Sequence, residues 1–520
     1  MTICKLLESI LASNEVKGLE YVFVFACVWC LGGGFSEKDG INYRKSFSDW
    51  WKDKWKIIKF PSKGTVFDYY VDLENNKLDE WIKLQTKDIS ESLDTSKPIQ
   101  NFTVPTTDTI STQFLMRKFI QVNLSPLLVG NAGCGKTQIT KGLLNDMTLN
   151  SDDYLQQTIN FNYYTDSTLL QSQLEQMLEK KAGKTYAPFG KFKLLQFIDD
   201  LNMPQLDPYE TQTAISLLRQ HKDYEHWYER GTKWALRDIK NTMYISAMNP
   251  TAGSFLVDPR LQRWFWIVAI PFPEQSSLNT IFAAFLNKHF SRFKGTIQEL
   301  VAPVIKSALS LHGEVEKTFR KTALNFHYEF NVRHLTNIFQ GLLVAKPEAI
   351  KEPDQLIKLW LHESERVYGD RLVNTEDLNK YRFLAADITK KSFGKFNLNK
   401  YFAQPTPEPL IFAYFVGGLE DKLYDQFAKM EDLVVRLRDA LREYNELNAT
   451  MDLVLFDDAM KHVCKISRII SSSSGHALLV GVGGSGKQSL SRLASSICQF
   501  RTTSIMISST YGLNELKIDL

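Results

Sequence analysis

Two glycine-rich segments that each contain a lysine carry the strongest chemical signal in this sequence. The first reads Gly130, Asn131, Ala132, Gly133, Cys134, Gly135, Lys136 and Thr137. The second reads Gly481, Val482, Gly483, Gly484, Ser485, Gly486, Lys487, Gln488 and Ser489. Glycines at these spacings let backbone N–H groups curl around an anion, and the lysine adds a cation that reaches phosphate oxygens. Both segments therefore predict phosphate-binding loops.

The two loops differ at the position that contacts a metal ion. In the first loop we expect Lys136 to reach the β- and γ-phosphates of a nucleotide and the Thr137 hydroxyl to coordinate Mg²⁺. The second loop has Gln488 where that hydroxyl is expected, with Ser489 one place later. It predicts phosphate binding and leaves the metal geometry open.

Polar side chains follow apolar runs at two further places. The run 194–198 ends in Asp199 and Asp200, and the run 243–248 ends in Asn249. A strand beside a P-loop presents carboxylates to the metal ion in this way, and a following amide can orient a water beside the γ-phosphate. These three residues are expected to belong to the site of the first loop.

Three arginines come later in the chain. Arg260 and Arg263 follow Asp258 and Pro259, and Arg333 opens a predicted helix that runs to Leu343. Each could be a solvated surface charge. Their order after the lysine, the carboxylates and the amide favours a role in the same reaction.

The elements that must position these residues alternate between strands and helices. Apolar runs 125–129 and 477–480 are predicted strands before the two loops, and a helix-like stretch follows each loop. A nucleotide-binding lobe is expected to begin near Val104. Residues 417 to about 470 read as helix, too short and irregular for a coiled-coil arm.

The first hundred residues predict a separate, mostly helical region. Residues 1 to about 60 carry aromatic side chains at helical spacing, including Trp51 and Trp55, which read as core rather than as a ligand platform. A strand is expected over 65–71, and the polar, proline-containing stretch 87–101 reads as a connector.

Length and composition exclude several classes of protein. The 520 residues are 44% hydrophobic, enough for several packed lobes, and the net charge of +3 is spread along the chain, so neither nucleic acid nor a membrane is an expected partner. Six cysteines in so long a chain indicate a reducing compartment. Cys27 and Cys30 read as core thiols within an apolar run that is too short to cross a bilayer, so we expect a soluble protein that is not secreted.

The order of these motifs resembles an AAA+ ATPase module, and two loops in one chain resemble a tandem AAA+ ring. Longer sequence segments resemble those of the axonemal dynein heavy chain: 197–204, 248–255, 330–333 and 478–490. The segments 219–221 and 226–228 and the early run 21–26 favour its outer-arm, beta-like branch. The resemblance covers essentially the whole chain.

The resemblance implies an α/β fold of P-loop AAA+ modules, each a parallel sheet flanked by helices, with a helical lid. Residues 1–90 would end the second module and include a connector. Residues 91–290 would be the large α/β subdomain of the third module and 291–415 its lid. Residues 416–520 would be connecting helices and the truncated start of the fourth module, cut off before its acidic strand.

Roles carried over from the family complete the expected site. Asp199 would hold Mg²⁺ through water, Asp200 would stand at the catalytic-base position, and Asn249 and Arg333 would be the first and second sensors. Either Arg263 or Arg260 would act as an arginine finger on the preceding module's nucleotide. Three residues would line the adenine pocket: Val104, Pro105 and Thr106.

The implied ligands and partners follow from the same resemblance. The cofactors would be ATP or ADP with Mg²⁺. The partners would be the remaining AAA+ modules of the same heavy chain and, through regions outside this sequence, dynein intermediate and light chains and microtubules. The location would be the cytoplasm and cytoskeleton, in the axoneme of a cilium or flagellum.

One departure from the wider AAA+ pattern bears on the rate of hydrolysis. Many AAA+ enzymes have Glu at the position of Asp200, and the shorter side chain draws the base back from the water, which predicts a slow, regulatory site. Two alternatives stay open: another giant tandem AAA+ remodelling ATPase, and a non-hydrolysing, nucleotide-locked scaffold. Small-molecule kinase activity is the least supported, because it explains neither the second loop nor the arginines.

Overall fold

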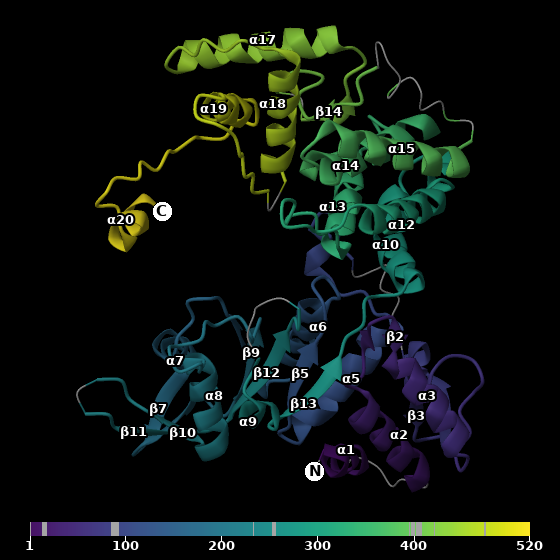
Figure 1. The fold of residues 1–520 in the computed structure, drawn as a ribbon, viewed down its shortest axis with the longest axis vertical. Helices are drawn as coiled ribbons and strands as arrows, with labels where there is room; N and C mark the ends of the chain where they lie inside the picture. The colour runs from purple at the N-terminus through teal and green to yellow at the C-terminus, as the bar shows by residue number, and fades with distance from the viewer. Residues whose placement is uncertain are drawn as a thin grey trace. The chain divides into compact units, whose positions relative to one another are not determined.

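The computed structural model describes residues 2–12, 18–84, 93–231, 233–251, 256–394, 396, 401, 408–420, 422–472 and 475–520. The chain divides into two compact units, Met1–Ala284 and Phe285–Leu520 (Figure 1). Each unit has its own packed interior, so each is considered by itself.

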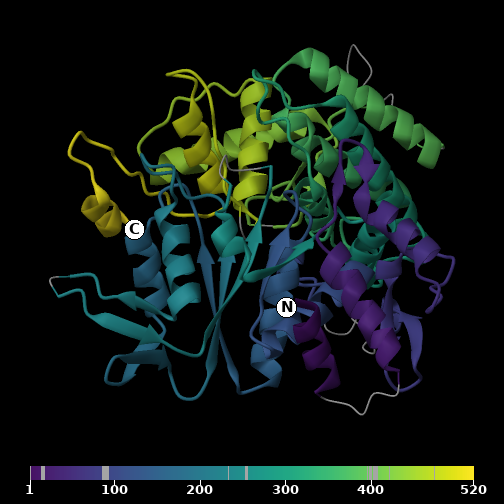
Figure 2. The same ribbon diagram turned by 60° about the horizontal axis from the view of Figure 1, so that its bottom comes forward.

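A five-stranded parallel sheet forms the centre of the first unit. Its strands, in spatial order, are β13 (Phe265–Ala269), β5 (Ser125–Val129), β12 (Thr242–Met248), β9 (Lys193–Asp199) and β6 (Tyr154–Asn160). Figure 2 shows these strands side by side from a second direction. The central strands are buried along nearly their whole length, as expected for a parallel sheet that is covered on both faces.

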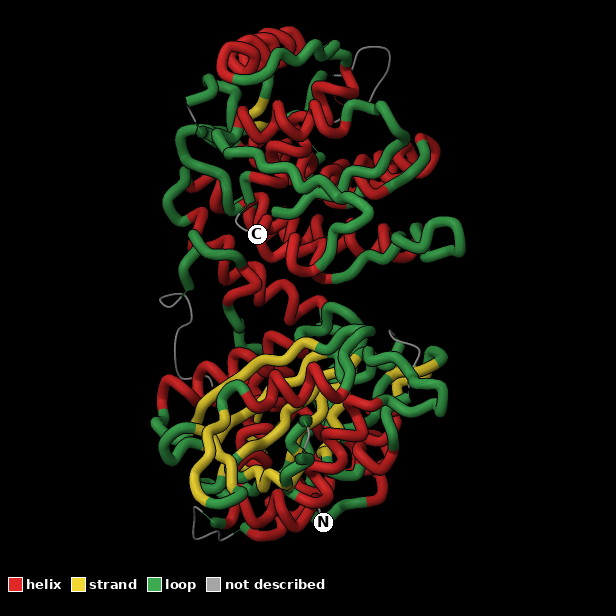
Figure 3. The backbone as a smooth tube through the Cα atoms, turned by 90° about the vertical axis from the view of Figure 1, so that its left-hand side faces the viewer, coloured by secondary structure: helices red, strands yellow, loops and turns green. Residues whose placement is uncertain are grey.

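Helices cover both faces of this sheet (Figure 3). Successive side chains of a strand point to opposite faces, and the structure divides them between two hydrophobic clusters. Leu195 and Phe197 of β9 pack with α5 (Thr107–Gln121) and α6 (Lys136–Asn150). Ile198 packs on the other face with α7 (Ser167–Glu175) and α8 (Thr213–Tyr224).

Short strands extend the first unit beside α7 and α8. A second sheet of four strands has the order β10 (His226–Tyr228), β11 (Leu236–Ile239), β8 (Thr185–Pro188) and β7 (Leu178–Ala182). The single turn α9 (Pro259–Gln262) precedes β13.

The N-terminal region shares the core of the first unit. It contains α1 (Thr2–Leu11), α2 (Leu19–Gly32), the hairpin of β1 (Glu37–Lys38) and β2 (Ile41–Asn42), α3 (Tyr43–Lys54), the hairpin of β3 (Tyr69–Asp72) and β4 (Lys77–Glu80), and the 3₁₀ turns η2 (Trp81–Leu84) and η3 (Ile99–Asn101). Helix α1 contacts α5. Trp81 is fully buried, and its indole N–H donates to the Phe67 carbonyl over 2.9 Å.

Several expectations for this region need correction or completion. The predicted strand over 65–71 is wrong in its first half, because Thr65 and Asp68 cap a 3₁₀ turn, η1 (Val66–Asp68), and the strand begins only at Tyr69. Trp51 is buried and stacks on Trp55, with ring centroids 5.3 Å apart. The first part of the predicted connector, residues 87–92, lies outside the described residues.

The thiols of α2 lie within or beside the core. Cys27 is buried and Cys30 half-buried, and burial raises the pKa of both thiols. Among the residues the structure describes, none forms a helix long and apolar enough to span a bilayer.

The second unit is mostly helical. Its helices are α10 (Gln275–Phe290, which begins in the first unit), α11 (Gly295–Gln298), α12 (Val301–Thr318), α13 (Val332–Leu342), α14 (Pro353–Val367), α15 (Thr375–Ser392), α17 (Met430–Leu447), α18 (Asp457–Ile470), α19 (Lys487–Ile497) and α20 (Leu513–Asp519), with the 3₁₀ turn η4 (Gly369–Arg371). Strands β14 (Phe412–Ala413) and β15 (Asp425–Gln426) form a small hairpin.

Two predicted elements of this unit differ from the structure. The stretch 417–470 is not one helix, because the hairpin strand β15 precedes α17 and residues 448–456 interrupt α17 and α18. The run 477–480 is not a strand: Leu478 is 90% exposed, and no strand of the described chain pairs with this run. An extended apolar segment becomes a strand only when a neighbour takes its backbone hydrogen bonds.

A buried ion pair joins α14 to α18 within the second unit. Arg468 donates to Glu363 through its guanidinium, with Nε lying 3.1 Å from Oε2, and the Tyr424 hydroxyl donates to Oε1 over 2.7 Å. Burial alone would raise the pKa of Glu363, but the attraction of Arg468 and these hydrogen bonds hold it below its ordinary value of 4.5. The stabilisation from this pair is therefore present above pH 4.5 and is lost as the pH falls below that value.

We expect Arg468→Met to destabilise the second unit by about 3–5 kcal/mol, because it leaves a charged Glu363 buried without its partner. The double variant Arg468→Met/Glu363→Gln should recover most of that loss, since no charge is then stranded and Tyr424 keeps an acceptor. Urea unfolding of both variants measures the difference. Equal unfolding of the single and double variants would contradict this account of the pair.

Candidate nucleotide-binding site

The carboxyl ends of three neighbouring strands define the candidate site. β12 pairs in parallel with β5 and β9, so that Met248 lies opposite Val129 and Ser246 opposite Ile198. The next residues along each strand are the ones singled out in the sequence. The pairing thus brings Gly130, Asp199 and Asn249 to one edge of the sheet.

The first glycine-rich loop connects β5 to α6. Gly133 and Gly135 have φ angles of +83° and +89°, which L side chains rarely adopt, and Gly135 caps the N-terminus of α6. Gly130 is needed for a different reason: a Cβ there would lie 2.4 Å from the Ile270 carbonyl oxygen. The loop therefore brings the N-terminus of α6, with its free N–H groups, to the edge of the sheet.

Lys136 lies across the mouth of this loop. Its ammonium donates to the carbonyl oxygens of Gly130 over 2.7 Å and Asn131 over 2.9 Å, and only 8% of the residue is exposed. Cys134 is buried beneath it, with Sγ 3.7 Å from Lys136 Nζ. The thiol therefore belongs to the packing of the loop, and the lysine places a cation next to the glycines.

The metal-binding pair expected from the sequence meets in the structure. Thr137 begins α6 beside Lys136, and its hydroxyl donates to Asp199 Oδ2 over 2.8 Å. Asp200 follows with a φ angle of +57°, and its backbone N–H donates to Asp199 Oδ1 over 3.1 Å. This left-handed turn separates the two carboxylates, so that Asp199 faces Thr137 and Asp200 is exposed.

Asn249 is held by a hydrogen-bond network that no sequence motif predicts. It is almost fully buried, and its side-chain oxygen accepts from the N–H and hydroxyl of Thr251, over 3.1 and 2.9 Å. Asn202 donates from its amide to the Asn249 carbonyl over 2.9 Å. Buried Asn202 is the positioning residue that the sequence did not identify; an amide two places after the carboxylates was the available signal.

The segment expected to line an adenine pocket is tied to α6. Val104 is buried, Pro105 half-buried, and the Thr106 hydroxyl accepts from the Thr109 N–H at the start of α5. Nearby, the Thr103 hydroxyl donates to the Gln138 carbonyl over 3.1 Å. These residues therefore lie next to the helix that carries Lys136 and Thr137.

The two arginines near α9 lie in different environments. Arg263 pairs with Asp223 over 2.7 Å on the surface, and Trp264 donates to the same oxygen. Burial would raise the pKa of Asp223, but these two donors hold it below its ordinary value. Arg260 is exposed, and no side-chain partner is found for it in the described part of the chain.

Arg333 lies in the second unit, at the N-terminus of α13. Asn331 caps this helix by accepting from the Arg333 N–H over 3.0 Å, while the Asn331 N–H donates to His334 Nδ1 over 3.1 Å. Arg371 donates to the other nitrogen of His334. The first turn that carries Arg333 is thus fixed on two sides, and its side chain is exposed.

The second loop repeats the backbone of the first. Gly484 and Gly486 have φ angles of +77° and +76°, and Lys487 Nζ donates to the Gly481 and Val482 carbonyls over 2.7 and 2.6 Å. Gln488 is exposed and Ser489 half-exposed. The phosphate-binding conformation is therefore local to the loop, because it forms here without a paired strand before it.

The residues of the first loop fit a nucleotide with a magnesium ion. Glycines in left-handed conformations place no side chain between the backbone N–H groups and an approaching phosphate, and a lysine adds positive charge. Hydroxyl and carboxylate oxygens, as offered by Thr137 and Asp199, are the ligands that Mg²⁺ prefers, together with phosphate oxygens and water.

Comparison with protein families divides the chain into three dynein segments and one AAA+ lid segment. Residues 91–273 match a model described as the P-loop containing dynein motor region, and 451–520 match the P-loop containing dynein motor region D4. Residues 304–403 match an AAA+ lid domain, and 1–83 match the dynein heavy chain AAA lid domain.

Alignments that span the whole of this chain indicate the same family. The chain is 48% identical to the dynein alpha chain of the flagellar outer arm from Chlamydomonas reinhardtii, 45% to dynein axonemal heavy chain 17 from Homo sapiens and 42% to the ciliary dynein beta chain from Tripneustes gratilla. Each alignment covers 100% of this chain and 12% of the relative. The P-loop sheet and both glycine-rich loops thus lie in segments named for the dynein motor, and the chain belongs to the axonemal dynein heavy chain family.

Proposed function

We propose that this chain is an ATP-binding segment of a dynein motor ring that drives ciliary or flagellar movement. The hydrogen bond between Thr137 and Asp199 carries the proposal. It joins helix α6, which follows the P-loop, to the end of strand β9, where a hydroxyl and a carboxylate together could hold a metal ion. A structural P-loop without a nucleotide would not need a hydroxyl and a carboxylate to meet there.

The protein groups divide the work at this site. The loop N–H groups and Lys136 would hold the β-phosphate of ADP or the β- and γ-phosphates of ATP, and Thr137 and Asp199 would hold Mg²⁺, Asp199 through water. When bound, Mg²⁺ neutralises charge that develops on the phosphate oxygens. Asp200 accepts a proton from the attacking water, and Asn249 orients that water. Val104, Pro105 and Thr106 contact the adenine.

A slow, regulatory site follows from Asp200. Its carboxylate is one methylene shorter than that of the glutamate common in AAA+ enzymes, so it reaches less far toward the water. The left-handed backbone at Asp200 suits Asp and Asn better than longer side chains. The local backbone conformation therefore favours aspartate over glutamate at this position.

Arg260 is the better of the two candidates for the arginine finger. Arg263 is engaged by Asp223 within its own unit, whereas Arg260 is exposed at the start of α9, whose backbone is fixed by the Asp258 cap. Asp258 also pairs with Arg219 over 3.2 Å, which orients the turn. A rigid turn with an uncommitted arginine suits a contact with the preceding module's nucleotide. Arg333 acts as the second sensor.

The wider assignment rests on the family. Residues 1–90 end the second module and include a connector, 91–290 and 291–415 are the large subdomain and lid of the third, and 416–520 begin the fourth. The other AAA+ modules of the heavy chain, intermediate and light chains, and microtubules are the partners, and the axoneme is the location.

Lys136→Ala should weaken binding of ATP by the first loop at least about tenfold, because a charge-assisted contact to phosphate is lost while the strand and helix remain. Lys141→Ala is the matched control, since Lys141 is exposed on the same helix. Titration with a fluorescent ATP analogue measures both, in a Lys487→Ala background that silences the second loop. Equal affinity in the Lys136 variant and its control would disprove the assignment of this loop.

Asp200→Asn should slow hydrolysis by roughly a hundredfold or more while sparing ATP binding, because it removes a proton acceptor and keeps the size of the side chain. Asp199→Asn should instead weaken Mg²⁺-dependent binding. Single-turnover hydrolysis in the intact heavy chain, and ATP titrations with Mg²⁺ and with EDTA, separate the two effects. Identical behaviour of the variants would refute distinct roles, and no hydrolysis at this site in the parent would favour the nucleotide-locked scaffold.

A further inference from the structure

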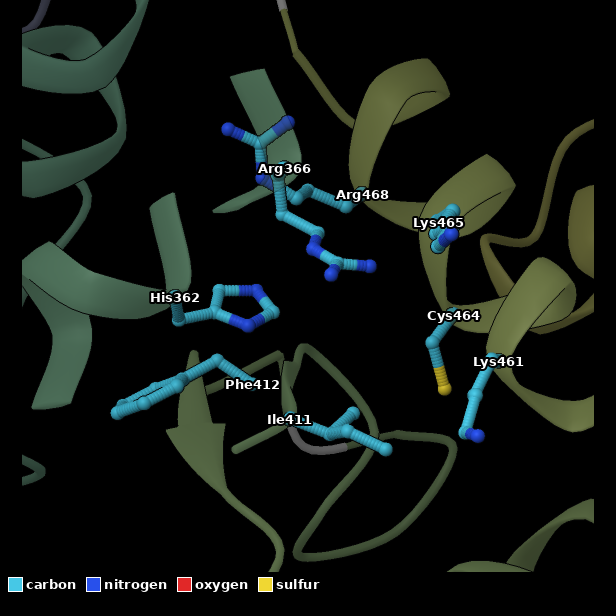
Figure 4. Close-up of a pocket in the computed structure, with 8 residues that line it drawn as sticks. All are labelled: His362, Arg366, Ile411, Phe412, Lys461, Cys464, Lys465 and Arg468. Atoms are coloured by element: carbon cyan, nitrogen blue, oxygen red, sulfur yellow. The ribbon is translucent and has the colours of Figure 1, made fainter. Parts of the chain in front are cut away.

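A small basic cavity lies in the second unit, away from both glycine-rich loops (Figure 4). Its empty volume of about 250 Å³ includes space that is open to solvent. Helix α14, strand β14 and helix α18 form its walls. The polar side chains that line it are His362, Arg366, Lys461, Cys464, Lys465 and Arg468.

Helical spacing explains why these side chains converge. His362 and Arg366 are four residues apart on α14, and Lys461, Cys464, Lys465 and Arg468 follow at three- and four-residue steps on α18. Residues at these intervals share one face of a helix. Two faces rich in nitrogen therefore meet across the cavity.

Several lining cations form ion pairs with carboxylates that do not themselves line the cavity. Arg366 directs one terminal nitrogen at Asp370 and the other at Glu365, each over 3.3 Å. Lys465 pairs with the same Asp370 over 2.9 Å, and Lys461 with Asp458 over 3.7 Å. None of these acids is among the lining residues, so the lining itself carries only positive or neutral groups.

Two buried polar atoms at the cavity have no hydrogen-bond partner among the described residues. They are Arg366 Nε, a donor, and His362 Nε2. His362 Nδ1 donates to the Leu410 carbonyl over 2.9 Å, which leaves Nε2 as an acceptor in the neutral ring. Burial lowers the pKa of His362 to about 4, so the ring is neutral at physiological pH. Its closest carboxylate oxygen, Glu363 Oε1, is 4.0 Å from Nε2 and outside hydrogen-bond range.

Figure 4 shows the guanidinium of Arg366 and the ring of His362 directed into the cavity, with Lys461 and Lys465 on the opposite side. A ligand that satisfies this lining must accept from Arg366 and the lysines and also donate to His362. Water alone could donate to His362 and accept from Arg366, but it would not balance the charge, because three cations, Arg366, Lys465 and Arg382, share the two carboxylates Glu365 and Asp370. A small oxyanion that keeps one acidic hydrogen meets both demands.

We propose that this cavity is a binding site for inorganic phosphate. Its unprotonated oxygens accept from Arg366 Nε and the two lysines, and its P–OH group donates to His362 Nε2. At neutral pH, phosphate retains a P–OH group and sulfate does not, so the site distinguishes two anions of similar shape. Bound phosphate would link α14, β14 and α18; the Glu363–Arg468 pair already joins α14 to α18.

The test uses the 520-residue chain with Lys136→Ala and Lys487→Ala, so that neither glycine-rich loop accounts for phosphate binding. Calorimetric titration at pH 7 and constant ionic strength should show saturable binding of phosphate and much weaker binding of sulfate. Lys461→Met should weaken phosphate binding roughly tenfold, the usual scale for loss of one charged hydrogen bond. Lys391→Met, which removes an exposed helical lysine on α15, is the matched control and should change nothing.

A second variant tests the donor to His362. His362→Asn keeps an N–H for the Leu410 carbonyl but removes the ring acceptor, and should reduce the preference for phosphate over sulfate; circular dichroism checks that it folds. No saturable phosphate binding, equal binding of phosphate and sulfate, or an unchanged Lys461→Met variant would each overturn the proposal. ATP binding through Lys136 is measured separately, so failure of this site leaves the proposed motor function untouched.

Discussion

The parallel pairing of β12 with β5 and β9 is the constraint on which the candidate site depends. Met248 opposite Val129 and Ser246 opposite Ile198 set the heights at which the three strands end. A slip of one residue in either pairing would turn the side chains of that strand to the other face. It would exchange the residues of the two hydrophobic clusters and separate Thr137 from Asp199. Burial on both faces of the sheet thus fixes the strand register, and the register determines which polar side chains meet at the site.

A comparison of the two glycine-rich loops distinguishes what the local sequence causes, the loop conformation, from what tertiary structure causes, the complete site. Both have left-handed glycines at the same positions and a lysine that donates to the first two carbonyls of its loop. Of the two loops, the first alone lies at the edge of a sheet in the described part of the chain, and there strand β9 brings Asp199 to the hydroxyl of Thr137. The loop conformation is encoded within a few residues, whereas a complete site needs strands that are distant in sequence.

In the second unit, polar groups are used where a hydrophobic contact could have served. Glu363, Arg468 and Tyr424 form a buried network between α14 and α18, and the basic cavity lies beside it. A buried pair of this kind contributes little net stability but penalises any arrangement that separates its members. It therefore favours one specific packing of the two helices, which also holds the cavity lining in place.

Much of the chemistry was readable from the sequence. The loops, the carboxylates, Asn249 and the strands β5, β9 and β12 all follow from residue type and spacing, because phosphate binding and burial impose strict local patterns. Longer-range pairing was less accessible. The run 477–480 has the composition of a strand but lacks a partner in the described chain, and the 3₁₀ turn at Val66–Asp68 is set by its Thr65–Asp68 cap.

What only the tertiary structure decided are the contacts between residues distant in sequence. Asn202 supports Asn249, Arg371 supports the turn that carries Arg333, and the two helix faces around His362 and Lys461 come together. Each depends on how elements pack rather than on any motif. The sequence by itself determined which groups can bind phosphate and metal, since that chemistry resides in short segments. Tertiary structure decided which of them meet, because burial and strand register act between segments far apart in the chain.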